Sequence, residues 1–386
     1  MNQSSQFGII KTAFVCLLFV QCFDGTTVVG QSFPVFKAVT IDPQIDKVCY
    51  GLTVADVNGD GRPDLVGVSD RAVYWYENPS WKRHRIIADQ TVKDNVCIAP
   101  LDIDQDGAVD FALGAGWTGT GTIQWLRRGK TLEDKWSVHP IATERWTHRM
   151  RFADVLGKGR PQLVVTPLNA TVGKGVRLMA FTIPKNPTMD RWVPVVLSDR
   201  LNRVHNHWHV DFDENGTVDT VAASQEGITL ITSHAGSFQS KTLNSEAAGE
   251  VKFGSLGKKQ PFMATIEPMH GTRAVVYTQK KEGWDRTVLD ESLQQGHAVW
   301  MADLNGDMAD EVIIGHRAAG KGDVKGPGLY AFQLDQQSGQ WKKHVIDNGG
   351  CAVEDAIAAD FNGDGKIDIA AGGRATHNVV IYFNGN

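Results

Sequence analysis

Short apolar runs, rich in β-branched and aromatic residues, alternate along this chain with polar turns rich in Gly, Asn, Asp and Pro. One unit begins with an apolar run that enters an acidic loop, as at Leu52–Asp56, and a second apolar run leaves that loop. A third run carries an aromatic residue, as at Val73–Asn78, and a fourth often begins with Trp, as at Trp81–Ile87. Runs of this length and composition are typical of strands rather than helices.

The acidic loop DVNGDGRPDLV (Asp56–Val66) marks a repeat. Further copies stand at Asp102–Ala112, Asp211–Val221, Asp303–Ile313 and Asp360–Ala370, and degraded copies at Asp154–Val164 and Phe253–Ile266. A four-strand unit that recurs at this spacing is typical of a β-propeller blade. The sequence therefore predicts an all-β, seven-bladed β-propeller of four-stranded blades over residues 31–386.

The two ends of the repeat region complement each other. The last unit stops at Asn386 after its third strand, and an isolated strand of the missing kind lies at Pro34–Asp42. We expect this N-terminal strand to complete the last blade and close the ring, which removes exposed sheet edges. An open β-solenoid or two sandwiches would be the alternative.

The first 30 residues read as a secretory signal peptide. Lys11 precedes the apolar run Thr12–Phe23, which is too short to span a bilayer, and small residues follow it. The expected location is therefore secreted or periplasmic, without membrane insertion after cleavage. The net charge of −5 argues against a nucleic-acid partner. Three cysteines remain beyond residue 30; Cys49 and Cys97 could pair, and buried free thiols are at least as well supported.

The acidic loops carry oxygen side chains at positions 1, 3, 5 and 9, a pattern that suits Ca²⁺. We expect up to five structural calcium sites, and an Asx-turn without metal is the alternative. The Asp303 loop departs from the pattern at Met308, and the Asp154 loop should be empty. The expected ligands are Asp56, Asn58, Asp60, Asp64, Asp102, Asp104, Asp106, Asp110, Asp211, Asp213, Asn215, Asp219, Asp303, Asn305, Asp307, Glu311, Asp360, Asn362, Asp364 and Asp368. These loops resemble the FG-GAP (VCBS) repeats of secreted and adhesive propellers.

A polar cluster appears when the repeats are aligned on the first Asp of the loop. Equivalent positions at the start of the innermost strands ring one mouth of a propeller channel, and convergent polar groups there are a candidate site. The candidate catalytic residues are His148, His205, His297, Glu354, His316, Arg317, Arg374 and His377. The candidate substrate-binding residues are Tyr50, Arg71, Trp117, Gln225 and His270. Inheritance of a structural His by duplication is the alternative. His207 and His209 are expected to be buried supporting residues.

This set of side chains suits two kinds of chemistry. Three imidazoles and a carboxylate can hold Zn²⁺ or another transition metal ion, or they can act as acid and base without metal. The arginines would neutralise a carboxylate or a developing enolate, and Trp117 would stack on a sugar ring. Together they fit β-elimination, in which a base removes the proton α to a carbonyl group.

Segments such as His148–Val155, His205–Phe212, His297–Asp307 and Asp360–Asn384 resemble the propeller domain of the aldos-2-ulose dehydratase family. The resemblance implies removal of water from keto-sugars. It covers propeller segments only, and not the cupin and lectin-like domains of that family. Propeller lyases that act on ulvan and rhamnogalacturonan offer an analogy. The sequence thus predicts a carbohydrate-active lyase or dehydratase for keto-sugars or uronic acids, with a non-catalytic carbohydrate- or protein-binding module as the alternative. A descendant of an enzyme that has lost activity is a third reading.

Overall fold

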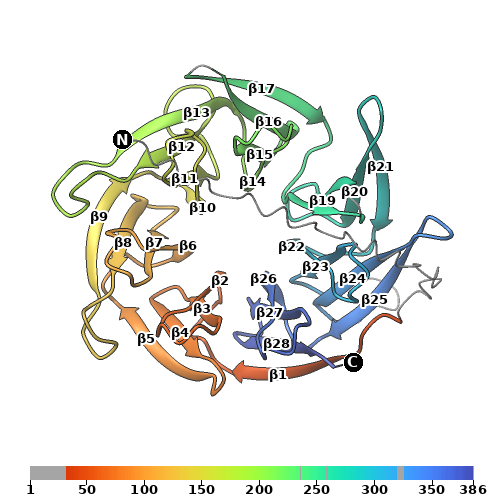
Figure 1. The fold of residues 1–386 in the computed structure, drawn as a ribbon, viewed down its shortest axis with the longest axis horizontal. Helices are drawn as coiled ribbons and strands as arrows, with labels where there is room; N and C mark the ends of the chain where they lie inside the picture. The colour runs from red at the N-terminus through yellow and green to blue at the C-terminus, as the bar shows by residue number, and fades with distance from the viewer. Residues whose placement is uncertain (1–31, 235, 258–259, 320–325, 386) are drawn as a thin grey trace, which may run out of the picture. The chain divides into compact units, whose positions relative to one another are not determined.

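A computed structural model describes residues 32–234, 236–257, 260–319 and 326–385 of the chain. The expected signal peptide at residues 1–30 lies outside these residues. Within the described ranges the regular structure consists of strands, which form seven antiparallel sheets of four strands each. The sheets follow one another around a ring as blades (Figure 1). The predicted seven-bladed β-propeller is confirmed.

The first four blades follow chain order from the inner to the outer strand. Blade 1 comprises β2 (Gly51–Ala55), β3 (Asp64–Val68), β4 (Ala72–Glu77) and β5 (Lys82–Ala88). Blade 2 comprises β6 (Asn95–Leu101), β7 (Asp110–Ala115), β8 (Thr122–Arg127) and β9 (Ser137–Thr143). Blade 3 comprises β10 (Thr147–Ala153), β11 (Gln162–Pro167), β12 (Val176–Thr182) and β13 (Val193–Leu201). Blade 4 comprises β14 (Asn206–Val210), β15 (Asp219–Ser224), β16 (Gly227–His234) and β17 (Ser237–Asn244).

The remaining blades repeat this order until the ring closes. Blade 5 comprises β18 (Lys252–Ser255), β19 (Pro261–Glu267), β20 (Arg273–Gln279) and β21 (Trp284–Asp290). Blade 6 comprises β22 (Gly296–Ala302), β23 (Glu311–His316), β24 (Gly328–Asp335) and β25 (Gln340–Asn348). Blade 7 comprises β26 (Val353–Ala359), β27 (Asp368–Gly373) and β28 (Val379–Asn384), with β1 (Phe36–Asp42) as its outer strand.

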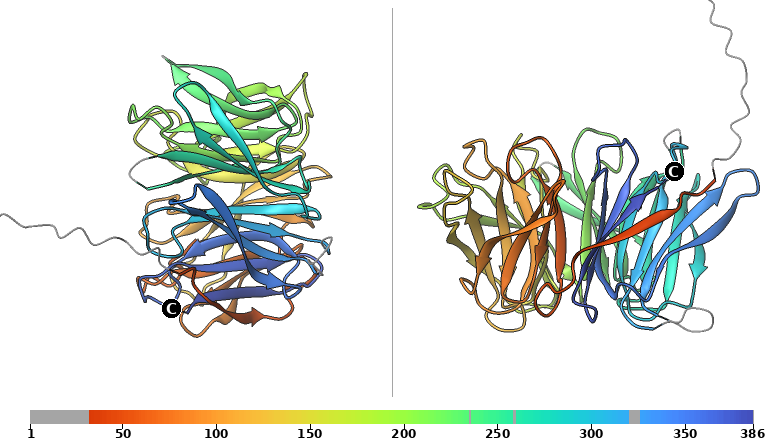
Figure 2. Two further views of the ribbon diagram at one scale, coloured as in Figure 1. Left: turned by 90° about the vertical axis from the view of Figure 1, so that its right-hand side faces the viewer. Right: turned by 90° about the horizontal axis from the view of Figure 1, so that it is seen from below.

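Strand β1 closes the ring as the sequence predicts. It pairs antiparallel with β28, from Phe36 opposite Asn384 to Asp42 opposite Val379. Figure 2 shows β1, in orange-red, running beside the blue strands of the last blade. The edge of β28 is therefore covered by a strand from the other end of the chain, which removes a site for edge-to-edge aggregation.

The core lies between neighbouring blades. The second strand of a blade is buried on both faces, and every residue of β3 is buried for this reason. Val66 and Trp75 of blade 1 pack in one cluster with Phe111 and Leu126 of blade 2. The inner strands are thus fixed by apolar packing on either side, and the channel at the centre can carry polar side chains.

The cysteines and the hydropathy of the described residues add two points. Cys49, Cys97 and Cys351 are buried free thiols, so Cys49 and Cys97 do not pair. Across the described ranges, no helix has the length and apolar character needed to cross a bilayer.

Candidate functional site

The residue six positions before the acidic loop stands at the start of each inner strand (Figure 1). In four blades the pairing of the first two strands shifts register around this residue, which is Val96, His148, His297 or Glu354. A β-bulge adds one residue to a strand and re-aims its side chain. The repeated bulge therefore gives these side chains a direction that regular strand alternation would not give.

Three histidines come together at this level of the channel. One side-chain nitrogen each from His205, His270 and His297 lies within 4.8 Å of the others. The Nε2 atoms of His205 and His270 are 3.1 Å apart. His148 lies beside this histidine triad, with its ring centre 4.6 Å from that of His205. The structure thus joins three predicted catalytic residues and one predicted substrate-binding residue into a single group.

Backbone carbonyl groups hold three of these imidazoles in one tautomer. Nδ1 of His148 is 3.1 Å from the carbonyl oxygen of His205, and Nδ1 of His205 is 2.8 Å from that of Gly249. Nδ1 of His297 bonds to the carbonyl oxygen of Glu354. Because a carbonyl oxygen only accepts, Nδ1 carries the proton and the lone pair of a neutral ring is on Nε2.

Burial disfavours the charged form of His148, His270 and His297. It lowers the pKa of His148 and of His297 well below the usual value of a histidine, and nearby arginine charges lower both further. Burial, together with the charge of His205, lowers the pKa of His270 to about 3. These side chains therefore act as lone-pair donors rather than as imidazolium acids. Metal ligation and base catalysis both fit neutral imidazoles, whereas the role of an imidazolium acid does not.

The triad fits a transition metal ion by its donor set. Zinc takes imidazole nitrogens at about 2.0–2.1 Å, so two nitrogens of one tetrahedral ion lie about 3.3 Å apart. The 3.1 Å between Nε2 of His205 and Nε2 of His270 is close to that value. Histidine ligands also usually donate their other N–H to a carbonyl or carboxylate, as His205 and His297 do here.

Glu250 is a buried carboxylate that the sequence analysis missed. Its Oε1 is 2.9 Å from Nδ1 of His205 and 3.9 Å from Nη2 of Arg149, and its Oε2 accepts a bond from Asn206. Burial alone would raise the pKa of Glu250, but the hydrogen bond and charge of His205 and the charge of Arg149 bring it down to about 2. Glu250 is therefore a buried carboxylate beside His205, whose Nδ1–H is bonded to the carbonyl oxygen of Gly249.

The loop in blade 5 explains why Glu250 was missed. Ser255 pairs with Pro261 as Ala55 pairs with Asp64, so Leu256 occupies the place of the leading Asp. Glu250 is six residues before Leu256 and is the blade 5 member of the ring. Because the acidic loop is lost there, only the strand pairing gives the register.

Glu354 is held between two arginines. Its Oε2 is 2.9 Å from Nη1 of Arg317, and its Oε1 is 2.7 Å from Nη1 of Arg374. Nε2 of His297 lies 3.7 Å from Oε1 of the same carboxylate. The guanidinium of Arg374 also lies 5.8 Å from the ring centre of Tyr50. Four predicted site residues thus form one charged group next to the histidine triad.

Trp117 lies where the sequence placed an aromatic platform. Its ring centre is 5.7 Å from that of His148 and 5.5 Å from that of Trp146, in an edge-to-face arrangement with the second ring. An aromatic face next to an imidazole can position a sugar ring.

Two predicted catalytic histidines have their contacts elsewhere. Nε2 of His316 bonds to the hydroxyl of Tyr330 at 2.9 Å, within blade 6. Nδ1 of His377 bonds to the carbonyl oxygen of Lys47. Among the described residues, no contact joins either histidine to the triad: His316 bonds within blade 6, and His377 bonds to the segment that precedes blade 1. Their prediction as catalytic groups is not supported by this arrangement.

Two predicted substrate-binding residues also lie apart from the triad. Arg71 pairs with Asp89 at 2.6 Å, and both side chains are about 60% exposed (60% and 61%). Gln225 is exposed, and its backbone N–H bonds to the carbonyl oxygen of Asn202. The loops between the second and third strands differ in length, so residues aligned by sequence are not equivalent in space. His207 is fully buried, as expected of a supporting residue.

The acidic loop of blade 2 has the geometry of a cation site. Carboxylate oxygens of Asp102, Asp104 and Asp110 lie within 4.8 Å of one another. Oδ1 of Asp104 is buried and has no hydrogen-bond partner within the described part of the chain. Burial, with the charge of Asp104, raises the pKa of Asp110 to about 7. Three hard oxygen donors crowded in this way fit Ca²⁺.

The Asp154 loop has an amide side chain, Gln162, at the position where the acidic loops have a carboxylate. Nε2 of Gln162 donates a 3.0 Å hydrogen bond to Oδ1 of Asp154. In the other loops position 9 is a carboxylate, such as Asp64, whose two oxygens accept bonds from the backbone N–H groups of Val57 and Asn78. The Gln162 amide thus lies where the acidic loops have a carboxylate, and the absence of a cation from the Asp154 loop stays a prediction.

The Asp303 loop keeps the same backbone despite its altered sequence. Met308 has φ 70°, where the equivalent Gly61 has 83° and Gly365 has 83°. Oε2 of Glu311 accepts a 2.8 Å bond from the N–H of Leu304, as Asp64 does in its own loop. Glu at position 9 thus replaces Asp in the loop framework.

The fold and the site define a class: a seven-bladed propeller with a histidine triad of two buried members and one half-buried member. The family model described as FG-GAP-like repeat matches residues 56–113. The one described as the β-propeller domain of aldos-2-ulose dehydratase matches residues 120–281. These matches confirm both resemblances inferred from the sequence.

A curated relative supports the second match. Aldos-2-ulose dehydratase of Phanerodontia chrysosporium is 22% identical over 303 residues, which cover 69% of this chain and 33% of that protein. This chain therefore spans about a third of the length of this relative.

Solved structures agree with the architecture. A structure described as BBS1N in complex with ARL6DN has a TM-score of 0.55 at 12% identity, covering 92% of this chain and 98% of that chain. An Agrocybe aegerita lectin that recognises non-reducing terminal N-acetylglucosamine has a TM-score of 0.48 at 13% identity, covering 88% of this chain and 86% of that chain. The first of these likenesses shows the fold alone.

Proposed function

We propose that this chain is a metal-dependent carbohydrate lyase or dehydratase that performs β-elimination at the histidine triad. The observation that carries the proposal is the convergence of His205, His270 and His297, whose donor nitrogens lie within 4.8 Å of one another. The distant relation to a sugar dehydratase supports a carbohydrate substrate. A divalent metal ion bound by these three residues would polarise the carbonyl oxygen of the sugar.

The other residues have separate roles in this proposal. His148 is one of the residues six positions before the acidic loops, but it is not part of the triad. Its Nε2 has no hydrogen bond among the described residues. It would take the proton from the carbon α to the carbonyl group as a neutral base, and would return that proton to the β-oxygen as the C–O bond breaks, so that a carbon–carbon double bond forms and water or an alcohol leaves. The backbone carbonyl oxygen of Glu354, whose carboxylate is held by Arg317 and Arg374, orients His297, and Trp117 would support the sugar ring beside His148.

We also propose that the chain is secreted and carries structural calcium in its acidic loops. The crowding of Asp102, Asp104 and Asp110 supports calcium binding in blade 2. The apolar segment after Lys11 supports secretion.

Elemental analysis of the purified protein tests the enzymatic proposal. We expect about one zinc, iron or manganese ion per chain, lost in the double variant His205→Ala/His270→Ala and retained in the control His377→Ala. Elimination from keto-sugars, followed as the ultraviolet absorbance of the enone, should disappear on chelation and return when the metal is restored.

Two results would contradict the proposal. Equal metal content in the double variant and the wild type would place the metal elsewhere. A triad that binds metal, without elimination on any keto-sugar or uronate, would favour a non-catalytic binding module. We keep that alternative because the match covers only about a third of the dehydratase.

A further inference from the structure

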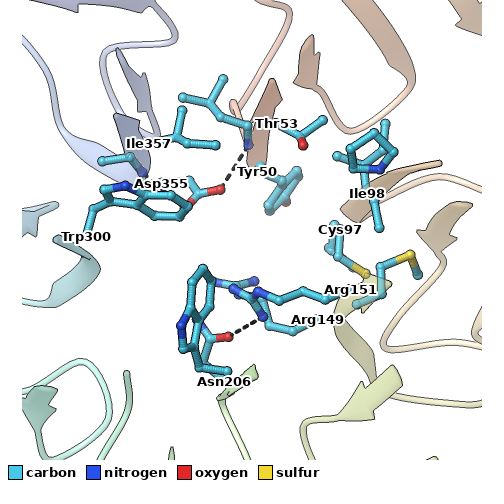
Figure 3. A pocket seen from close by; sticks show the side chains of 18 of the residues that line it. Tyr50, Thr53, Cys97, Ile98, Arg149, Arg151, Asn206, Trp300, Asp355 and Ile357 are labelled. Carbon is cyan, nitrogen blue, oxygen red and sulfur yellow. Dashed lines mark hydrogen bonds between the residues drawn. The ribbon is translucent and has the colours of Figure 1, made fainter. Parts of the chain in front are cut away.

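A second feature is a cavity of about 300 Å³ between the inner strands, whose lining includes Arg149 and Asn206, the residues that follow His148 and His205 in the sequence (Figure 3). Tyr50 and Val96, which belong to the ring of residues six positions before the loops, also line this cavity. Its volume is at the lower end of the range for ligand pockets, about 300–1,000 Å³. The cavity therefore suits one sugar unit rather than a polymer segment.

Three cationic side chains converge on this cavity: Arg149, Arg151 and Lys252. Figure 3 shows both arginines reaching toward the central space from β10. Lys252 is only 3% exposed. Its Nζ lies 4.4 Å from the ring centre of Trp208 and 5.4 Å from that of Trp300. In the described parts of the chain, Lys252 has no hydrogen bond or ion pair.

The two nearby acids are already engaged. Oδ2 of Asp355 accepts a 2.9 Å bond from the N–H of Leu52, and its Oδ1 accepts a 3.1 Å bond from the N–H of Ala356. Glu250 is engaged by His205 and Asn206. The closest approach of an arginine to either acid is the 3.9 Å between Arg149 and Glu250. Nη1 of Arg151 donates to Asn206 and to the carbonyl oxygen of His207, and Nη1 of Arg149 donates to the carbonyl oxygen of His148. The remaining N–H groups of the two arginines and the ammonium of Lys252 are the donors left for a ligand.

The cations also oppose one another, which an anion would relieve. Burial, with the charge of Arg151, lowers the pKa of Lys252 to about 7. Burial likewise lowers the pKa of Arg151 to about 10, although nearby carboxylates act in the opposite direction. A buried charge without a partner is costly, and proteins keep such groups mainly for function.

We propose that this cavity binds the carboxylate of an acidic sugar, so that the substrate of the triad is a uronic acid or a related sugar acid. The inference rests on the proposed function and specifies its substrate class. Arginine presents a planar fork that matches a carboxylate in two parallel hydrogen bonds, and lysine adds a mobile donor. Neutralising that carboxylate also makes the proton on the adjacent carbon easier to remove.

Calorimetric titration of the full-length protein with galacturonate, and with galactose as the neutral match, tests the inference. We expect galacturonate to bind at least about tenfold more tightly than galactose. Lys252→Met and Arg151→Met should each lose about tenfold in galacturonate affinity. The control Lys343→Met should not, because Lys343 also stacks on an aromatic ring, Tyr330 at 3.8 Å, but lies on the outer strand of blade 6.

The outcomes separate this inference from the proposed function. Equal affinity for the two sugars, or galacturonate binding that survives both cavity variants, overturns the inference. If the protein eliminates neutral keto-sugars and Lys252→Met leaves that activity unchanged, the proposed function stands. The inference of an acidic sugar substrate is then overturned. Tighter binding of galacturonate that persists in His205→Ala/His270→Ala supports the anion site independently of the triad. Thermal unfolding of each variant confirms that it is folded.

Discussion

At the scale of single residues, the inner strands bring a group of histidines and a group of positively charged side chains together. Burial disfavours the charged form of His270 and His297 in the triad, whereas Arg149, Arg151 and Lys252 form a cationic group on β10 and β18, two inner strands that carry no triad residue. Neutral nitrogens favour a metal ion, and clustered cations favour an anion. A sugar acid with a carbonyl group or carboxylate near its reacting carbon would satisfy both at once.

The buried ammonium of Lys252 predicts a pH dependence of stability. Its pKa falls from 10.5 in the unfolded chain to about 7 in the fold, so the unfolded chain holds more protons between these values. The free energy of unfolding should therefore rise with pH over that range. The penalty is complete below pH ~7 and absent above pH ~10.5.

Chemical denaturation of the wild type and Lys252→Met across this range measures the effect. The variant should be more stable at pH 7 by about 2–4 kcal/mol and should converge with the wild type near pH 10. The charges of Arg149, Arg151, Glu250 and Asp355 face Lys252 and set the size of the difference. A variant that is less stable at pH 7 would show that the ammonium is well compensated in the fold.

The sequence located some of these residues and not others, for a physical reason. His148, His205 and His297 could be aligned because an intact or recognisable acidic loop follows each at a fixed distance. Glu250 precedes a loop without its acids, so its register depends on strand pairing alone. The cations of the cavity were not singled out because strand residues that face the axis have no distinguishing pattern in the sequence.

At the scale of elements, the acidic loops share one backbone and differ in their side chains. Oδ1 and Oδ2 of the leading Asp accept N–H bonds from the loop, as Asp56 does from Gly59 and Gly61. These bonds shape the loop with or without metal, which is why the loop positions could be predicted. No described contact joins Arg71 or Gln225, in the loops between the second and third strands, to the triad, so their part in the site stays a prediction.

Calcium dependence should follow the carboxylates of each loop. We expect Asp102→Asn to remove the calcium-dependent stabilisation of blade 2, which for one site is about 2.7 kcal/mol at 100 times the Kd. The matched control is Asp154→Asn, because Gln162 already bonds to Asp154 in that loop. Thermal unfolding with calcium and with a chelator measures both. An equal loss of calcium dependence in the two variants would contradict the assignment.

At the scale of the whole molecule, the position of the site depends on ring closure. The triad draws on β22, on the start of β14 and on the loop after β19, so three blades must stay in register. Seven blades could be predicted because the repeat and the complementary ends are visible in the sequence. The pairing of β1 with β28 also brings Asp42 to blade 1, where its Oδ2 accepts a 2.8 Å bond from the hydroxyl of Tyr76.

Removal of β1 should therefore open the ring. We expect a chain that begins at residue 43 to lose at least about 3 kcal/mol, since it gives up the apolar contacts of Phe36 and Ile41 and leaves the buried Tyr76 hydroxyl unpaired. The exposed edge of β28 should also promote self-association. Thermal unfolding and size-exclusion chromatography measure these effects, and a chain that begins at residue 32 is the control.

A peptide of residues 33–42, added in trans, should restore the monomer and the stability, whereas the same peptide with Asp42→Ala should restore less. If the shortened chain remains monomeric and equally stable, β1 is not the strand that closes the ring.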